Sequence, residues 1–386
     1  MGEAHGGRNH RHDPGGARLP LRAALPRLGV DPGRRQGVTR PVRVVQVGLG
    51  LWGSNWAADV LPEVETVEAV GYIDSSPAAL RQVQKAIGVP RRRCFTDLAS
   101  ALEAVEAELV LATASVDAHF AVARAALEAG RHVLVEKPFT ATLAEAAELA
   151  ALSEATGRRC DVSQNYRFQP APILAARLLA RGRIGRVHQV TVDFRRNAMN
   201  EGIVRDWVRK EPLLLDMAIH HFDLMRMVLA DEPVRVSCRS WNPGQSRYTE
   251  PAAAVATIDF AGGTVVSWRG SFVSEGEPTP WAGCWRIEGS EGELRFSSRD
   301  HLGSRVRPDR LSLRRGGRSV RVPAQPVLAH LDREGALAAT AQAILSGSAG
   351  ALVSDARHNA RSLALAHAAI ASAGAGGAWT DIERAP

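Results

Sequence analysis

The chain has 386 residues, enough for two domains, and 45% of them are hydrophobic, which allows a sizeable buried core. It contains no apolar run of about 18 residues or more, so a membrane span is not expected. The formal net charge of +7 is uneven: residues 1–40 carry eight Arg and three acidic residues, whereas the other 346 carry 40 basic and 38 acidic residues. The charge of this nearly neutral body gives no support for nucleic-acid binding, which requires a basic face, and we expect no nucleic-acid partner.

The head of the chain, residues 1–40, is rich in Gly, Pro, Arg and His and lacks the apolar core of a secretory signal. We expect it to be a disordered leader. A start site assigned too far upstream, or a tail that binds an anionic partner, are the alternatives.

The four cysteines are isolated, with no C-x-x-C pair and no histidine cluster near them. This spacing argues against a zinc site and against a disulfide scaffold. It suits a reducing cytoplasm, and we expect a cytoplasmic protein with no metal.

Residues 41–165 alternate strands and helices. Helices are expected over 52–61, 77–87, 118–129 and 143–156, and strands over 42–47, 67–73, 109–112 and 132–135. Such alternation predicts parallel βαβ units and a doubly wound Rossmann domain.

Residues 166–386 have a different pattern, with consecutive strands and short turns. Strands are expected over 187–194, 234–240, 254–260, 264–268, 285–288 and 293–296, and helices over 171–181, 213–229, 328–346 and 355–373. The pattern predicts an α+β domain with a large open antiparallel or mixed sheet, whose last helices can pack back on the Rossmann domain.

A full G-x-G-x-x-G motif, Gly48-Leu49-Gly50-Leu51-Trp52-Gly53, follows the first strand and opens a helix. In that context glycines let backbone N–H groups approach a pyrophosphate, so Gly48, Leu49, Gly50, Trp52 and Gly53 are candidate dinucleotide-binding residues. The alternative is a turn that only packs a helix on the sheet.

Three further polar residues lie near this crevice. Asp74 ends the second strand, 21 residues after Gly53, where a carboxylate binds ribose hydroxyls and repels a 2′-phosphate. It therefore favours NAD, with NADP as the alternative. Thr113 ends the third expected strand and His119 begins the helix after it; both are candidate cofactor contacts, although His119 could equally be a packing or capping residue.

The segment Glu136-Lys137-Pro138 comes just after a strand, at the sheet edge where ligands of α/β proteins bind. The chain has three Lys against 45 Arg, so a retained Lys suggests a task that needs a removable proton. We expect Lys137 near the nicotinamide and Glu136 near the cofactor. A surface lysine in a turn is the alternative.

Asp216, His220 and Asp223 have the i, i+4, i+7 spacing of one helix face. A histidine between two carboxylates can be held in one tautomer and shifted in pKa, which suits proton transfer. The alternatives are a hydrogen-bonded structural histidine and a metal site.

Together these motifs resemble the Gfo/Idh/MocA oxidoreductase family. The resemblance runs from about Val42 to the C-terminus and is strongest in Gly48–Gly53, Ala126–Pro138, Asn165–Phe168 and Asp216–Asp223. It implies an active-site Lys137 followed by a cis Lys137–Pro138 bond, a catalytic Asp216 and His220, and a C-terminal sheet that forms a homodimer or homotetramer.

The resemblance also implies oxidation of a secondary alcohol of a sugar, inositol or related polyol, or the reverse, with Asn165, Arg167 and Asp223 as substrate contacts. Where the family commonly has glycines before the catalytic helix, this chain has Glu211-Pro212. The alternatives are an NAD-dependent glycoside hydrolase that oxidises its sugar transiently and a non-catalytic dinucleotide-binding regulator.

Overall fold

The computed structural model describes residues 40–198, 211–302, 305–323 and 328–383. The expected leader, residues 1–40, lies outside this range except for Arg40. Across these segments no helix is both long enough and apolar enough to cross a membrane.

The first sheet has seven strands in the order β17-β6-β5-β4-β1-β2-β3. All pair in parallel except β17, which is antiparallel to β6. The strands are β1 (Val42–Val47), β2 (Val67–Ile73), β3 (Cys94–Phe95), β4 (Leu109–Ala112), β5 (His132–Val135), β6 (Cys160–Val162) and β17 (Ser354–Asp355).

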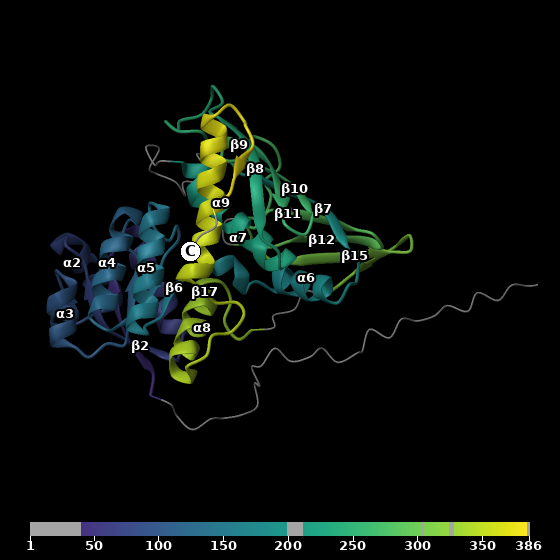
Figure 1. Cartoon of the computed structure of the whole chain (residues 1–386). Helices are drawn as coiled ribbons and strands as arrows, with labels where there is room; N and C mark the ends of the chain where they lie inside the picture. Colours follow the sequence, from purple (N-terminus) through teal and green to yellow (C-terminus); the bar gives the residue numbers. More distant parts are fainter. Residues whose placement is uncertain (1–39, 199–210, 303–304, 324–327, 384–386) are drawn as a thin grey trace, which may run out of the picture. The chain divides into compact units, whose positions relative to one another are not determined.

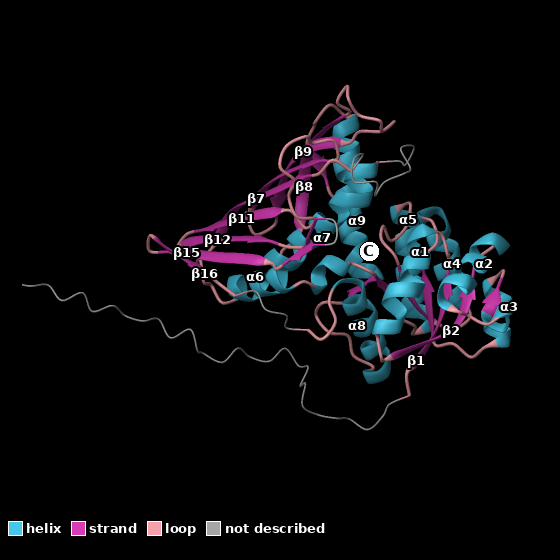
Figure 2. Ribbon diagram, turned by 180° about the vertical axis from the view of Figure 1, so that it is seen from behind, coloured by secondary structure: helices cyan, strands magenta, loops and turns pink. Residues whose placement is uncertain are grey.

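Helices lie on both faces of this sheet because alternate residues of its strands point to opposite sides. Val45 of β1 belongs to an apolar core with residues of α3, α4, α5 and α9, whereas Val44 belongs to a second core with residues of η1, α2 and α8. Figures 1 and 2 show α2 to α5 beside this sheet. The helices up to residue 168 are α1 (Leu51–Asn55), η1 (Trp56–Val60), η2 (Leu61–Glu63), α2 (Pro77–Ile87), η3 (Arg91–Arg93), α3 (Leu98–Ala104), α4 (Val116–Glu128), α5 (Leu143–Thr156) and η4 (Asn165–Phe168).

Local signals set several helix ends. At the start of α5, the Thr142 side chain accepts a hydrogen bond from the backbone of Glu145, and the Glu145 carboxylate accepts one from the backbone of Thr142. At its end, Gly157 adopts the left-handed conformation (φ 62°) that closes many helices.

The second sheet has nine strands in the order β16-β15-β12-β11-β7-β10-β9-β8-β18. β7 and β10 are parallel and the remaining pairs are antiparallel, so the sheet is mixed. Its strands are β7 (Val187–Arg195), β8 (Pro233–Trp241), β9 (Ala253–Phe260), β10 (Val265–Ser271), β11 (Cys284–Gly289), β12 (Gly292–Ser297), β15 (Arg310–Arg315), β16 (Arg318–Arg321) and β18 (Thr380–Asp381); β13 (Asp300–Leu302) and β14 (Arg305–Arg307) form a separate hairpin.

One face of the second sheet is covered by helices, which share its apolar core (Figure 1). These are α6 (Pro170–Ala180), η5 (Pro212–Met217), α7 (Ala218–Leu229) and α9 (Ala356–Gly374). The same α9 also packs into the first domain, as does α8 (Asp332–Ser346), through Leu363 and Leu337. The C-terminal helices therefore tie the two sheets together.

The expected fold class is confirmed: a doubly wound domain is followed by an α+β domain with a large mixed sheet. Two expected helices differ in detail. Residues 52–61 form α1, the π-helical η1 and part of the 3-10 η2, and residues 213–229 divide into the π-helical η5 and α7. The strands β3, β6 and β13 to β18 and the helix α3 were not predicted.

Candidate functional site

The glycine turn between β1 and α1 contains two kinds of glycine. Gly48 has φ +94°, and a Cβ there would lie 2.4 Å from the Ala114 backbone; a Cβ on Gly53 would lie 1.9 Å from the carbonyl oxygen of Gly48. A Cβ on Gly50 would meet nothing within 4 Å. Packing therefore requires Gly48 and Gly53, whereas Gly50 leaves the outer side of the turn open for a ligand to approach.

Buried side chains hold the turn from beneath. The Thr113 hydroxyl donates to the Gly48 carbonyl (2.7 Å), and the Gln46 amide donates to the Gly53 carbonyl (2.7 Å) and to the Thr113 hydroxyl (2.9 Å). Thr113 thus supports the loop that was expected to bind the cofactor. Sequence reasoning missed Gln46, although a polar residue in an otherwise apolar strand directly before a glycine turn was a usable signal.

Asp74 lies at the end of β2, against the same turn. Its carboxylate accepts hydrogen bonds from the backbone N–H groups of Leu49 (2.7 Å) and Ser76 (2.8 Å). The acidic group is therefore fixed in position next to the open side of the glycine turn, and each oxygen keeps a further lone pair for another donor.

Lys137, at the end of β5, meets the segment that precedes α7. Its ammonium nitrogen lies 2.8 Å from the Asp216 carboxylate and 2.9 Å from the Asp216 carbonyl oxygen. The two side chains are 15% and 20% exposed, so the pair faces a partly open space. The Lys137–Pro138 bond is cis. The Lys137 amine and the segment that contains Asp216, which are far apart in sequence, thus converge.

His220 lies beside this pair and is 4% exposed. Its ring stacks on Tyr166 with centroids 4.0 Å apart and planes 6° apart, and its Nδ1 atom is buried without a hydrogen-bond partner. Burial, helped by the positive charges of Lys137 and Arg299, holds the His220 pKa well below its ordinary value. The imidazole is therefore neutral at physiological pH and can accept a proton.

Asp216, His220 and Asp223 do not share one regular α-helical face, because the backbone changes from a π-helix to an α-helix between the first residue and the other two. Asp216 lies in the π-helical η5, which has more residues per turn than an α-helix, so the i, i+4 relation with His220 does not apply there. Glu211 immediately before it is left-handed (φ 44°). The chain therefore places a glycine-like conformation where the family pattern has glycine, although the residue is Glu.

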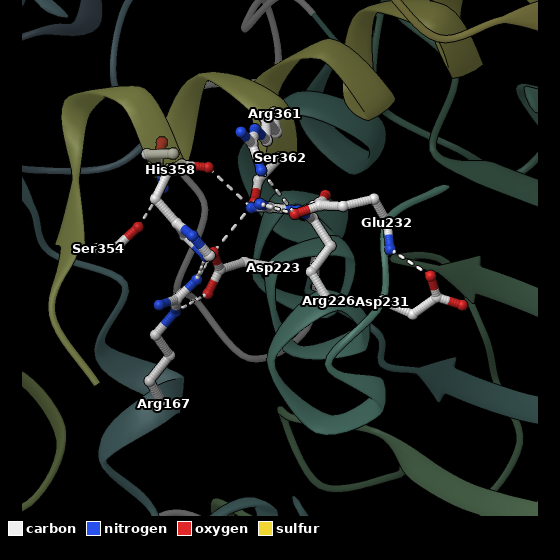
Figure 3. Close-up of polar contacts among 10 residues, drawn as sticks. Arg167, Asp223, Arg226, Asp231, Glu232, Ser354, His358, Arg361 and Ser362 are labelled. Carbon is white, nitrogen blue, oxygen red and sulfur yellow. Dashed lines mark hydrogen bonds and ion pairs between the residues drawn. The ribbon is translucent and has the colours of Figure 1, made fainter. Parts of the chain in front are cut away.

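Asp223 belongs to a buried network that Figure 3 shows in close-up. Arg167 donates two hydrogen bonds to its carboxylate, at 2.5 and 2.6 Å, and Ser362 of α9 donates a third at 3.0 Å. Burial opposes the ionisation of Asp223, but the charge and hydrogen bonds of Arg167 outweigh it and lower the pKa. Both residues are 1% exposed.

This geometry corrects the expected substrate contacts. Arg167 and Asp223 direct their charges at each other and expose almost no surface, so they anchor α7 to η4 and α9 instead of facing a substrate. Asn165 is also buried, and its amide donates to the Asp332 carboxylate. These three residues consequently support the walls of the site.

Three remaining candidates surround the cofactor crevice. His119 is 2% exposed, and its two ring nitrogens lie 2.9 Å from the carbonyl oxygen of Pro138 and 3.1 Å from that of Ala114, so the neutral ring can donate to either one, which matches its alternative packing role. The buried Glu136 carboxylate accepts the indole N–H of Trp56 (2.8 Å) and the backbone N–H of Lys137 (3.0 Å). Trp52 is 48% exposed.

These observations fit a dinucleotide. The open Gly50, the fixed Asp74 carboxylate and the Lys137 amine line the carboxyl edge of the parallel sheet, where ligands of doubly wound folds bind. Within the described segments, no three His, Cys, Asp or Glu side chains are grouped to hold a metal ion.

Comparisons with known proteins agree with this arrangement. Residues 42–164 match the model of the oxidoreductase family with the NAD-binding Rossmann fold, and residues 173–295 match the GFO/IDH/MocA C-terminal domain. The chain belongs to the Gfo/Idh/MocA family of oxidoreductases.

Two curated relatives and one solved structure illustrate the likeness. The chain is 27% identical over 267 residues to an uncharacterized protein, y4oX, of Sinorhizobium fredii, covering 67% of this chain and 73% of the relative. It is 30% identical over 233 residues to inositol 2-dehydrogenase 1 of Saccharopolyspora erythraea, covering 58% and 66%. The fold matches the inositol dehydrogenase homolog of Azotobacter vinelandii complexed with NADH and myo-inositol, with TM-score 0.74, 21% identity and coverage of 89% and 98%.

Proposed function

We propose that this protein is an NAD-dependent dehydrogenase that transfers a hydride between the nicotinamide and a secondary alcohol of a sugar, inositol or related polyol. The observation that carries the proposal is the meeting of Lys137, Asp216 and the unpartnered His220 at the sheet edge next to the glycine turn. The inositol dehydrogenase relatives support the substrate class.

In this proposal the dinucleotide supplies the hydride acceptor or donor, and the protein handles the proton. The neutral His220 imidazole, whose Nδ1 has no hydrogen-bond partner in the folded chain, accepts the proton of the substrate hydroxyl. Lys137, held by Asp216, donates a hydrogen bond to the same oxygen and stabilises the charge that develops on it. Tyr166 keeps the imidazole ring in plane by stacking on it.

The cofactor preference follows from Asp74. The carboxylate lies where the adenosine ribose of a dinucleotide is expected, so it accepts the ribose hydroxyls of NAD and repels the 2′-phosphate of NADP. We therefore propose NAD as the preferred cofactor, with NADP bound more weakly.

We further propose that the protein forms a homodimer or homotetramer through the second sheet. Val255 and Val265 of the neighbouring strands β9 and β10 are each more than 40% exposed, and they pair with the charged residues Arg269 and Asp259. Exposed apolar side chains among charged ones are compatible with an interface between subunits. The four free cysteines suit the reducing conditions of a cytoplasm, which we propose as its location.

The test is a screen of inositols, aldoses and sugar acids with the purified full chain, in which NADH formation is followed by absorbance with NAD and with NADP. We expect at least one polyol or sugar to be oxidised, and faster with NAD. Failure to bind NADH in calorimetry would overturn the dinucleotide assignment. Release of an aglycone without net NADH would replace the dehydrogenase with the transient-oxidation hydrolase.

A further inference from the structure

The start of α8 reaches the site from the C-terminal part of the chain. Asp332, its first residue, is left-handed (φ 55°) and accepts hydrogen bonds from Asn165 and Arg299. A left-handed non-glycine residue costs free energy, so these contacts hold the start of α8 in one place. The next residue, Arg333, is thereby directed to the other side, toward the glycine turn.

Arg333 lies against the turn. Its guanidinium carbon is 4.5 Å from the ring centroid of Trp52 and 5.5 Å from that of Trp56. Trp52 belongs to the G-x-G-x-x-G motif, and the residue is 48% exposed. The stacked guanidinium therefore covers the part of the turn that would face a bound phosphate.

The Arg333 guanidinium has hydrogen-bonding capacity left over. Its Nη1 atom is buried without a partner, and in the described segments it is the one terminal arginine nitrogen in that condition. The carboxylates of Asp332 and Glu136 attract the guanidinium electrostatically, but the Nη1 atom forms a hydrogen bond with neither of them. A buried donor without an acceptor is costly, and it indicates a group that the folded chain itself does not provide.

The glycine turn also lacks positive charge of its own. The sequence contains no Lys, Arg or His between Val44 and Leu80, a span that includes the part of β1 after Arg43, the turn, α1 and Asp74. A dinucleotide pyrophosphate carries two negative charges, which the backbone N–H groups of the turn neutralise only in part. Arg333 is a cation placed against this turn from outside the Rossmann segment.

We propose that Arg333 binds the pyrophosphate of the dinucleotide, so that α8 closes the cofactor site over Trp52. The inference rests on the proposed dinucleotide binding and adds to it a phosphate ligand that comes from the C-terminal helix. A planar guanidinium suits this task, because it can donate two hydrogen bonds to phosphate oxygens while it stacks on an indole.

The test compares the binding of NADH and of ADP-ribose, which keeps the pyrophosphate and lacks the nicotinamide, by titration calorimetry. Arg333→Met should weaken both ligands about tenfold to a hundredfold, as expected for the loss of a charged hydrogen bond. Arg333→Lys should bind both ligands more tightly than Arg333→Met does, and this gain in affinity should be smaller at high salt. The control is Arg357→Met, which removes the same charge from an exposed pair with Glu154 and should leave both affinities unchanged.

The outcomes separate the inference from the proposed function. A wild-type chain that binds neither ligand overturns both. Wild-type binding with unchanged ADP-ribose affinity in Arg333→Met and Arg333→Lys overturns the inference alone. In that case, a lower unfolding temperature of the ligand-free variants would show that Arg333 stabilises the fold by stacking on Trp52. A raised KM for the alcohol would show that Arg333 contributes to substrate binding.

Discussion

The glycine turn and the segment around α7 form the two halves of the site by different means. The turn is built from neighbours in sequence, and two of its glycines are required because any Cβ would overlap the backbone. The α7 segment is positioned by partners far along the chain: Lys137 for Asp216, Arg167 for Asp223 and Tyr166 for His220. Substitutions in the first half should therefore act on cofactor binding, and those in the second on turnover and stability.

The largest expected effect is on turnover. Lys137→Met removes the ammonium group that is proposed to hold the substrate oxygen, and kcat should fall by about 10²–10⁴. The Kd for NADH should change little, because the glycine turn is intact. Lys85→Met, at an exposed position of α2, is the matched control. Normal turnover in Lys137→Met would remove the lysine from the mechanism.

The next effect is on stability. Arg167→Met leaves the Asp223 carboxylate buried without its main partner, which should reduce the free energy of unfolding by about 3–5 kcal/mol in denaturant titrations. The double variant Arg167→Met, Asp223→Leu should recover part of this loss. The exposed pair Arg124–Glu128 provides the contrast, since Arg124→Met should cost about 1 kcal/mol or less. Equal losses in Arg167→Met and Arg124→Met would contradict the anchoring role.

A pair of glycine variants separates packing from binding. Gly53→Ala places a Cβ 1.9 Å from the Gly48 carbonyl oxygen, so the turn must shift, and we expect NADH to bind about ten- to a hundredfold more weakly, with a lower unfolding temperature. Gly50→Ala has open space and should keep the unfolding temperature while it weakens NADH binding. If Gly50→Ala bound NADH normally, the ligand would not lie against the turn.

The smallest effect concerns pH. Burial lowers the His221 pKa to about 4. Its Nδ1 accepts a hydrogen bond from the Trp268 indole (3.2 Å), and its Nε2 bonds the Trp281 carbonyl (3.0 Å). This pair of bonds suits only the neutral imidazole, because the protonated ring has no nitrogen that can accept. The folded pKa lies below the unfolded value of about 6.5, so the unfolded state takes up more protons between these values. The contribution of His221 to the free energy of unfolding should be fully present above about pH 6.5 and should decline as the pH falls toward 4.

The measurement is the unfolding temperature across that range. His221→Gln should flatten the decline, whereas His188→Gln, at an exposed position of β7, should leave its slope unchanged. An unaltered slope in His221→Gln would show that other groups cause the acid sensitivity.

Several strands and helices of four or more residues, with a clear apolar run or period, could be predicted from sequence. The ranges 42–47, 67–73, 77–87, 109–112, 132–135 and 143–156 coincide with β1, β2, α2, β4, β5 and α5. Strands β3 and β17 have two residues each and β6 has three, too few to show a period. The π-helical turns η1 and η5 were also out of reach, because local residue preferences do not distinguish them from an α-helix.

For this protein, the sequence by itself determined the family, the order of the main strands and helices and the glycine turn, because each depends on contiguous residues or on a compact motif. The approach of Lys137 to the segment of His220 was predicted through the family resemblance, since these residues are far apart in sequence. Only the tertiary structure decided that Arg167 and Asp223 face each other, that Tyr166 stacks on His220 and that Arg333 covers Trp52. These contacts join segments tens to hundreds of residues apart, and a buried charge finds its partner only once the whole core has closed around it.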